Sequence, residues 1–210
     1  VAFAEVMHTA LAYFQGGRQE QAYQIMKGAI MDGMFLGKSP GNVGQVSFYD
    51  AARGETYRDF ADPVGVYSRT FVEGLFGVEP NLLENIVLLR PSFPEPWDTA
   101  YFKTPYLSYS FSKNDGQQHW QIHPTFRKAT ALELQIPVSE ANVKSVKVNG
   151  KHVAIEYLST SINQPKLKIH CPAAENYIID IEEGKADEPV LQYESRVTQG
   201  EVLTYHLAKD

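Results

Sequence analysis

Cysteine is almost absent from this sequence: Cys171 is the single one among 210 residues. A lone cysteine excludes a disulfide within the chain and a cysteine-rich zinc site. It lies in the alternating segment 166–171, on the apolar side with Leu167 and Ile169, and we therefore expect a buried structural thiol. Stability must come from apolar cores, for which a hydrophobic content of 43% is sufficient.

Strong charge of one sign and long apolar runs are also missing. The formal net charge is −6, with acidic and basic residues spread evenly, and without a basic stripe nucleic acid is not expected as a partner. No apolar run approaches the roughly 18 residues of a membrane span, and the start has no charged-then-apolar signal region. The length fits one large or two small domains. Because the sequence starts within a helical pattern and without methionine, we expect it to be part of a longer protein.

Three familiar site motifs are absent or incomplete. The run 41–44 (GNVG) lacks the Gly-Lys-Ser/Thr ending of a phosphate loop. His119 and His123 lie on a predicted strand, where four residues span about 13 Å, too far for the two rings to share one metal ion. No Gly-x-Ser-x-Gly elbow occurs. We therefore expect no metal and no cofactor.

The first third of the chain has the apolar spacing of helices. Residues 1–37 show two such stripes separated by Gly16-Gly17, which predicts a helical hairpin. A third helix is predicted over residues 63–76, with Asp62 as its N-cap and Gly77 at its end. Three helices leave an apolar surface uncovered, so we expect them to pack on the domain that follows or on helices outside this chain.

The second half alternates with period two, which is typical of strands. The segment 86–89 is a short strand-like run, and the proline-rich segment after it is extended. Strands follow from about Tyr101, and Asn149-Gly150 predicts a two-residue hairpin with positive φ at both positions. We therefore predict an α+β multidomain chain: a helical segment over 1–85, a connector over 86–100 and an antiparallel β-sandwich over 101–210.

The loop 40–61 concentrates polar and aromatic groups without helical or strand periodicity. Long loops of this kind in compact domains are uncommon and often functional. Carboxylates, guanidinium groups and aromatic rings together suit a sugar, whose hydroxyls and apolar face need both kinds of contact. A structural alternative is that Arg58 and Asp59 simply pair and pin the loop. The candidate residues are Gln45, Tyr49, Asp50, Arg53, Glu55, Tyr57 and Arg58.

The run 58–63 (RDFADP) opens the third helix, and the run 74–77 (GLFG) closes it. Together with the helical hairpin, the polar loop and the sandwich, these runs make the chain resemble the end of a six-hairpin, (α/α)6-barrel glycosidase. The chain is similar in particular to bacterial members grouped as a domain of unknown function. The resemblance implies a substrate pocket lined by the loops before inner helices. It also implies two carboxylates that act as general acid and base, most often with inversion. The run 47–50 (SFYD) matches a Glu-x-aromatic-Asp arrangement of related families except at the glutamate, which is serine here.

These patterns lead to one leading hypothesis and one alternative. The leading hypothesis is the C-terminal portion of a carbohydrate-active enzyme, an inverting glycoside hydrolase. In it, Asp50 is the base, Glu55 the second choice, and the acid lies on an earlier hairpin of the barrel. Its partners would be a carbohydrate substrate and the rest of that barrel, and the resemblance implies a periplasmic or extracellular setting. The alternative is a non-catalytic sugar-binding or scaffold module whose sandwich exposes a row of aromatic residues: Tyr106, Trp120 and Tyr157.

Overall fold

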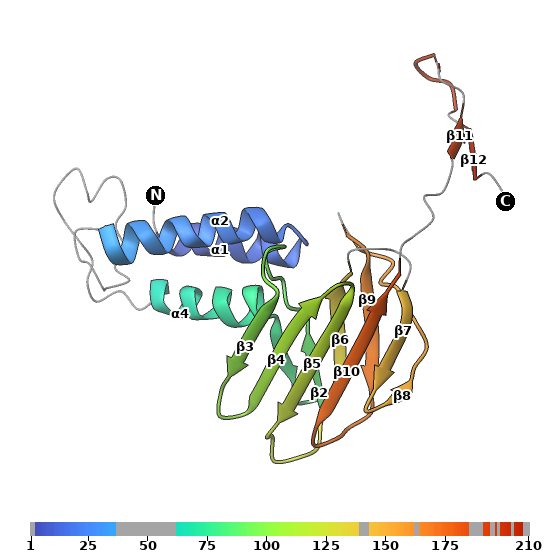
Figure 1. The fold of residues 1–210 in the computed structure, drawn as a ribbon. Coiled ribbons are helices and arrows are strands. Elements are labelled where there is room, and N and C mark those ends of the chain that lie inside the picture. The colour runs from blue at the N-terminus through green and yellow to red at the C-terminus, as the bar shows by residue number, and fades with distance from the viewer. Residues whose placement is uncertain are drawn as a thin grey trace, which may run out of the picture.

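The computed structural model describes residues 3–36, 62–138, 143–161, 164–184, 191–193, 196, 198–202 and 204–207. Within these ranges a helical layer comes first in the chain and lies at one end of a two-sheet sandwich (Figure 1). The fold is therefore α+β, as the sequence patterns predicted.

The helical layer confirms the predicted hairpin and third helix. Helix α1 covers Phe3–Gln15, and α2 covers Gln19–Ile30 and continues as the π-helix η1, Met31–Leu36. Helix α4 covers Asp62–Arg69 and continues as the π-helix η2, Thr70–Leu75. The apolar stripe of α1 is buried, as its helical spacing requires, and consists of Phe3, Ala4, Met7, Ala10, Leu11 and Phe14.

The sandwich consists of two sheets, and in the longer strands β4, β5, β6, β9 and β10 buried residues alternate with more exposed ones. The four-stranded sheet contains β1 (Val78–Asn81), β2 (Ile86–Leu89), β6 (Ala131–Pro137) and β9 (Lys166–Cys171), in that order. The six-stranded sheet contains β3 (Thr99–Lys103), β4 (Leu107–Asn114), β5 (Gln117–Pro124), β10 (Tyr177–Glu183), β7 (Val143–Val148) and β8 (Lys151–His152). Two further strands, β11 (Leu191–Tyr193) and β12 (Tyr205–Leu207), pair only with each other.

Two details of the sandwich differ from the sequence-based prediction. The strand-like run 86–89 is observed as β2, but β1, which no sequence pattern indicated, precedes it and pairs with it as a hairpin at the edge of the smaller sheet. The sandwich is also not wholly antiparallel, since β2 and β6 pair in parallel. The cause is the three-stranded meander β3–β4–β5, which lies between β2 and β6 in sequence but belongs to the opposite sheet. Because the chain reverses its direction from each strand to the next, these three strands bring it back into the smaller sheet in the direction of β2, and β6 therefore runs parallel to β2.

Local turn chemistry is confirmed where the sequence made it explicit. Asn149 and Gly150 have φ values of 49° and 77° and join β7 to β8 as a two-residue hairpin. Asp115 and Gly116 do the same between β4 and β5, with φ values of 46° and 73°. The buried Cys171 also agrees with the prediction, and burial raises the pKa of its thiol to about 11.

Phe76 joins the helices to the sandwich. Its ring centroid lies 6.2 Å from that of Phe71 in η2, 5.8 Å from Phe93 and 5.1 Å from Phe102. The hydroxyl of Tyr109 donates a hydrogen bond of 2.7 Å to the Phe76 carbonyl, and burial raises the pKa of Tyr109 well above its ordinary value. Helical and sandwich side chains therefore form one continuous core, which confirms that the helices pack on the domain that follows them.

Gly77 makes this junction possible. Its φ of +66° lies in the left-handed region, which ends the helix and turns the chain into β1. The backbone of Arg90 passes directly over Gly77, and the Arg90 amide donates a hydrogen bond of 2.9 Å to the Gly77 carbonyl. A Cβ atom at position 77 would overlap the Arg90 carbonyl group. Glycine is therefore required at this position both for conformation and for space.

We predict that Gly77→Ala destabilises the chain far more than Gly150→Ala. Both positions have positive φ, but no atom lies within 4 Å of a Cβ built at Gly150. Gly150→Ala should cost about 1 kcal/mol, the usual penalty of the left-handed region, whereas Gly77→Ala should cost about 4 kcal/mol or prevent folding. Chemical denaturation of both variants measures the difference. Equal losses would show that the close approach to Arg90 carries no weight.

Candidate functional site

The predicted sugar-binding loop lies outside the described residues. This applies to every candidate named from the sequence: Gln45, Tyr49, Asp50, Arg53, Glu55, Tyr57 and Arg58. The structure describes the two helical ends that flank the loop, namely η1 up to Leu36 and α4 from Asp62 onward.

Both flanks lie at the end of the helical layer that points away from the sandwich (Figure 1). The start of α2 is fixed to the sandwich side, where Gln19 Nε2 donates to Gln164 Oε1 at 2.8 Å and the Tyr23 ring lies 5.5 Å from Trp97. The other end of α4 runs through η2 into β1. At a rise of about 1.5 Å per residue, Leu36 is about 25 Å from the start of α2, and Asp62 is about 20 Å from the end of η2.

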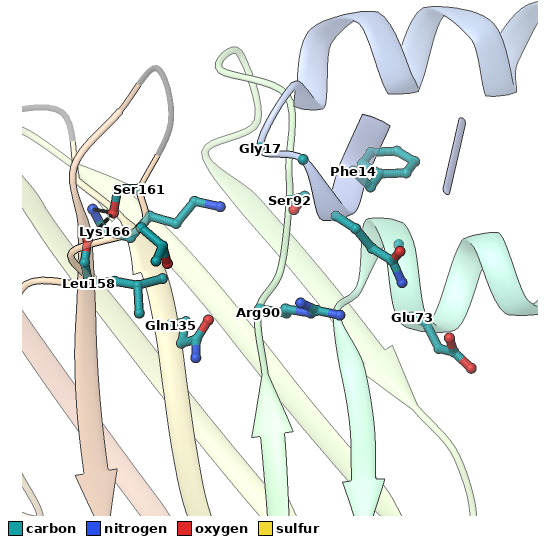
Figure 2. A pocket seen from close by; sticks show the side chains of 13 residues that line it. Phe14, Gly17, Glu73, Arg90, Ser92, Gln135, Leu158, Ser161 and Lys166 are labelled. Atoms are coloured by element: carbon teal, nitrogen blue, oxygen red, sulfur yellow. Dashed lines mark hydrogen bonds between the residues drawn. The ribbon is translucent and has the colours of Figure 1, made fainter. Parts of the chain in front are cut away.

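A polar cavity of about 190 Å³ lies at the junction itself, between the helical layer and the smaller sheet (Figure 2). The turn between α1 and α2 and the helix η2 form one wall, and β6, β9 and the segment 158–161 form the other. Ser161 closes that segment, because its hydroxyl donates to the Leu158 carbonyl at 2.7 Å and accepts from the Lys166 amide at 3.2 Å. These two hydrogen bonds hold the segment 158–161 in place as a wall of the cavity.

Cations dominate the charge of this cavity. Arg90, on its floor, pairs with Glu79, and Glu73, at its edge, pairs with Arg69 at 2.7 Å. Burial and then the nearby charge of Arg90 lower the pKa of Lys166. The turn that follows the C-terminal end of α1 lines the same space with Gly16 and Gly17. The partial negative charge of a helix C-terminus partly offsets the charge of these cations.

The junction cavity does not have the groups for glycoside hydrolysis by an acid and a base. That chemistry needs two carboxyl groups on opposite sides of the bond that is cleaved. Among the described residues that line the cavity, Glu73 is the one carboxylate, and it is paired with Arg69. The described lining of the junction cavity therefore does not supply an acid and a base for a sugar.

No group of three or more His, Cys, Asp or Glu side chains that could hold a metal ion occurs in the described ranges. The two histidines considered above have other partners on the outer surface of the larger sheet. His119 Nδ1 lies 2.6 Å from Asp180 Oδ1, and His123 Nδ1 lies 2.5 Å from Asn176 Oδ1. None of the described helices is both long and apolar enough to cross a membrane.

The expected row of exposed aromatics on the sandwich is wrong at Trp120. This residue is 1% exposed, and its ring packs 4.4 Å from that of Phe111 in the core. Tyr106 and Tyr157 are exposed, at 63% and 40%. The alternation of β3 could have identified Tyr101, which is 63% exposed at an outward position.

Tyr101 lines a shallow hollow of about 460 Å³ on the outer surface of the larger sheet. More of its lining surface is apolar than polar, and its polar lining residues include Ser108, Ser110, Gln121, His123 and Asn176. Such a combination of one exposed ring and several hydrogen-bonding groups can accept a hydroxylated ligand.

Comparison with known proteins gives matches in structure but not in sequence. No protein-family model and no curated protein sequence matches the chain. An α-L-rhamnosidase structure from Dictyoglumus thermophilum matches 86% of this chain at 15% identity with a TM-score of 0.53. This chain spans 21% of that rhamnosidase, so it shares the fold of about a fifth of the larger protein.

Two weaker structural matches are also glycosidases by name. A Streptomyces avermitilis α-L-rhamnosidase complexed with L-rhamnose matches 61% of this chain and 12% of its own, at 12% identity and a TM-score of 0.37. A GH127 β-L-arabinofuranosidase from Geobacillus Stearothermophilus T6 matches 89% of this chain and 32% of its own, at 11% identity and a TM-score of 0.32.

We predict that Lys166→Met raises the stability of the chain at pH 7. The lowered pKa means that the fold disfavours the charged ammonium, and methionine keeps a similar apolar stem without that charge. The gain should shrink as pH rises toward 10.5, the ordinary value for lysine, because the parent then loses the charge in both states. Denaturant midpoints at pH 7 and 10.5 measure both effects.

Lys168→Met is the matched control for this prediction. Lys168 lies two residues further along the same strand, and its ammonium is 3.5 Å from Glu156 at the surface. Surface pairs of this kind contribute little to stability. The free energy of unfolding of Lys168→Met should therefore stay within about 0.5 kcal/mol of that of the parent. A clear loss of stability in Lys166→Met would show that the cavity holds its ammonium favourably.

Proposed function

We propose that this chain is the C-terminal portion of a carbohydrate-active enzyme, and specifically of an inverting glycoside hydrolase built on an (α/α)6 barrel. The observation that carries the proposal is the structural likeness to an α-L-rhamnosidase across 86% of the chain, helices and sandwich together. The resemblance of residues 40–97 to six-hairpin glycosidases supports the same class independently of the structure.

In this proposal the loop 40–61 lines a sugar pocket at the end of the helical layer remote from the sandwich. Two structural facts support the location. The flanking helix ends both lie at that end, about 20 to 25 Å from the junction, and the described lining of the junction cavity has a single, already paired carboxylate. A pocket at the remote end would also adjoin the N-terminus of α4, which favours anionic groups nearby.

Catalysis in an inverting enzyme requires an acid and a base about 6.5 to 9.5 Å apart, with a water molecule beside the base. We assign the base to Asp50, with Glu55 as the second choice, and the acid to an earlier hairpin of the barrel. Tyr49 would stack on the sugar ring. Hydroxyl groups would be bound by Gln45, Arg53, Tyr57 and Arg58. This chain alone is then inactive, because it lacks the acid.

The sandwich has a mechanical role in this proposal. It shares one core with the helices, and Phe76 and Gly77 fix the end of η2 against the strands. Because η2 continues α4 without interruption, the position of Asp62, where the loop ends, depends on that anchor. The remaining hairpins of the barrel would be the structural partner of the helical layer, in a periplasmic or extracellular protein.

A second candidate function is a non-catalytic carbohydrate-binding or scaffold module. The observation that favours it is the hollow beside Tyr101 on the outer surface of the larger sheet, with its exposed ring and hydrogen-bonding side chains. Sugar binding by the isolated chain would support the module and would be independent of any residue in the loop 40–61.

We predict that Asp50→Asn lowers turnover by about 10² to 10⁴ in the full-length protein that carries this chain, while its stability is unchanged. Asparagine keeps the shape and the hydrogen-bonding groups but removes the charge that activates water. Hydrolysis of a glycan that the parent protein cleaves gives the rate, and thermal unfolding gives the stability.

Asp62→Asn provides the control, because Asp62 begins α4 and asparagine suits a helix start about as well as aspartate. Its turnover should match the parent. If Glu55→Gln abolishes turnover while Asp50→Asn does not, the base is Glu55. If both variants hydrolyse the glycan at the parent rate, the catalytic role of the loop is wrong.

A further inference from the structure

A mainly apolar cleft of about 650 Å³ lies at the end of the sandwich opposite the helices. Three turns form it: the turn between β1 and β2, the turn between β3 and β4, and the segment between β5 and β6 (Figure 1). Its apolar lining includes Pro80, Leu82, Tyr106 and Phe126. The described lining residues of the cleft and of the junction cavity do not overlap.

Hydrogen bonds hold the walls of this cleft in place. Thr125 ties two of the three turns together, because its amide donates to the Tyr106 carbonyl at 2.8 Å and its hydroxyl donates to the Pro105 carbonyl at 2.8 Å. The third turn is fixed where the Ala131 amide donates to the Asn85 carbonyl at 2.8 Å. A ligand would therefore meet a preformed surface, which lowers the entropy cost of binding.

Two aromatic rings form the central part of that surface. The rings of Tyr106 and Phe126 are nearly parallel, with an interplanar angle of 5° and centroids 6.1 Å apart. Tyr106 is 63% exposed, although a tyrosine of a sandwich usually buries most of its ring. Tyr106 exposes most of its side chain, whereas Phe126 is partly buried against the core. Aromatic ring faces of this kind suit the C–H faces of sugar rings.

The charge of the cleft is positive. Arg127 and Lys128 are its charged lining residues, and neither side chain forms a hydrogen bond or ion pair with another described residue. The chain as a whole carries a formal net charge of −6. Two exposed cations beside an aromatic pair, with no partner among the described residues, are complementary to an anionic ligand, and a guanidinium group binds a carboxylate through two parallel hydrogen bonds.

We propose that the cleft formed by Tyr106, Phe126, Arg127 and Lys128 is a binding site for acidic oligosaccharides, whose uronate rings stack on the aromatic pair while their carboxylates bind the two cations. This site does not depend on the proposed hydrolytic pocket, because the two lie at opposite ends of the molecule. It would hold an acidic glycan on the sandwich whether or not the helical end is catalytic.

The test is direct binding of a hexamer of galacturonate to the 210-residue chain by calorimetry, at low and at high salt. The methyl-esterified hexamer, which has the same sugars without charge, and polyglutamate, which has the charge without sugars, are the comparison ligands. The variants are Tyr106→Ala, the double change Arg127→Gln with Lys128→Gln, and Tyr101→Ala. Tyr101 is the matched control, because it has the same exposed fraction of 63% but lies on the outer surface of the larger sheet.

The proposal expects the acidic hexamer to bind more tightly than either comparison ligand and to weaken as salt screens the charges. Tyr106→Ala should weaken the binding of the acidic hexamer about tenfold. The double variant should bind the acidic hexamer only as tightly as the esterified one, and Tyr101→Ala should bind it as tightly as the parent does. The double variant keeps this test valid even if Tyr106→Ala disturbs folding. Both cations are exposed and have no partner among the described residues, so their replacement should leave the fold intact.

Three results would overturn the proposal. The first is absence of binding, or affinity for polyglutamate equal to that for the acidic hexamer. The second is loss of binding in Tyr101→Ala rather than in Tyr106→Ala, which would assign the sugar to the hollow beside Tyr101. The third is a chain that dimerises without sugar and becomes monomeric in Tyr106→Ala, which would make the cleft a contact between copies of the chain.

Discussion

The arrangement of this chain depends on the close approach of two backbone segments, at Gly77 and Arg90. The left-handed glycine ends a helix and begins a sheet within one residue, and the hydrogen bond from the Arg90 amide fixes the second segment over the first. Phe76, the residue before this turn, is thereby placed among the rings of Phe93 and Phe102. The helical layer and the sandwich consequently share one core instead of meeting across a flexible linker.

This constraint links the sandwich to the proposed chemistry. A rigid α4–η2 helix with a fixed C-terminal end also has a fixed N-terminal end, and the loop 40–61 ends there. In the proposed enzyme, the sandwich would act as the support that sets the position of a pocket about 20 Å away. The likeness to an α-L-rhamnosidase spans both parts together, which agrees with their behaviour as one structural unit.

Local features were predictable from the sequence, and non-local ones were not. The hairpin at Asn149-Gly150 and the helix end at Gly77 follow from the conformational needs of single residues, and both are observed. The parallel pairing of β2 with β6 joins segments more than forty residues apart and leaves no local pattern. Burial of Trp120 likewise depends on Phe93 and Phe111 from elsewhere in the chain.

The candidate sites show the same division. The loop 40–61 was identified because its composition is unusual over one short stretch, whereas its geometry falls outside the described residues. The cleft at the far end of the sandwich has no such stretch, because Tyr106 and Phe126 come from different turns and meet only in the fold. Similarly, the lowered pKa of Lys166 depends first on its burial and then on the charge of Arg90, which no spacing rule connects to it.

Equilibrium unfolding followed by two signals tests the shared core most directly. Circular dichroism at 222 nm reports the helices, and in a Trp97→Phe variant fluorescence reports Trp120 in the sandwich core, where that side chain is 1% exposed. A single core predicts that both signals change at the same denaturant concentration with one cooperative transition. Loss of the helical signal at a lower concentration than the fluorescence change would contradict the account, because the helices would then be a separate unit that only rests on the sandwich.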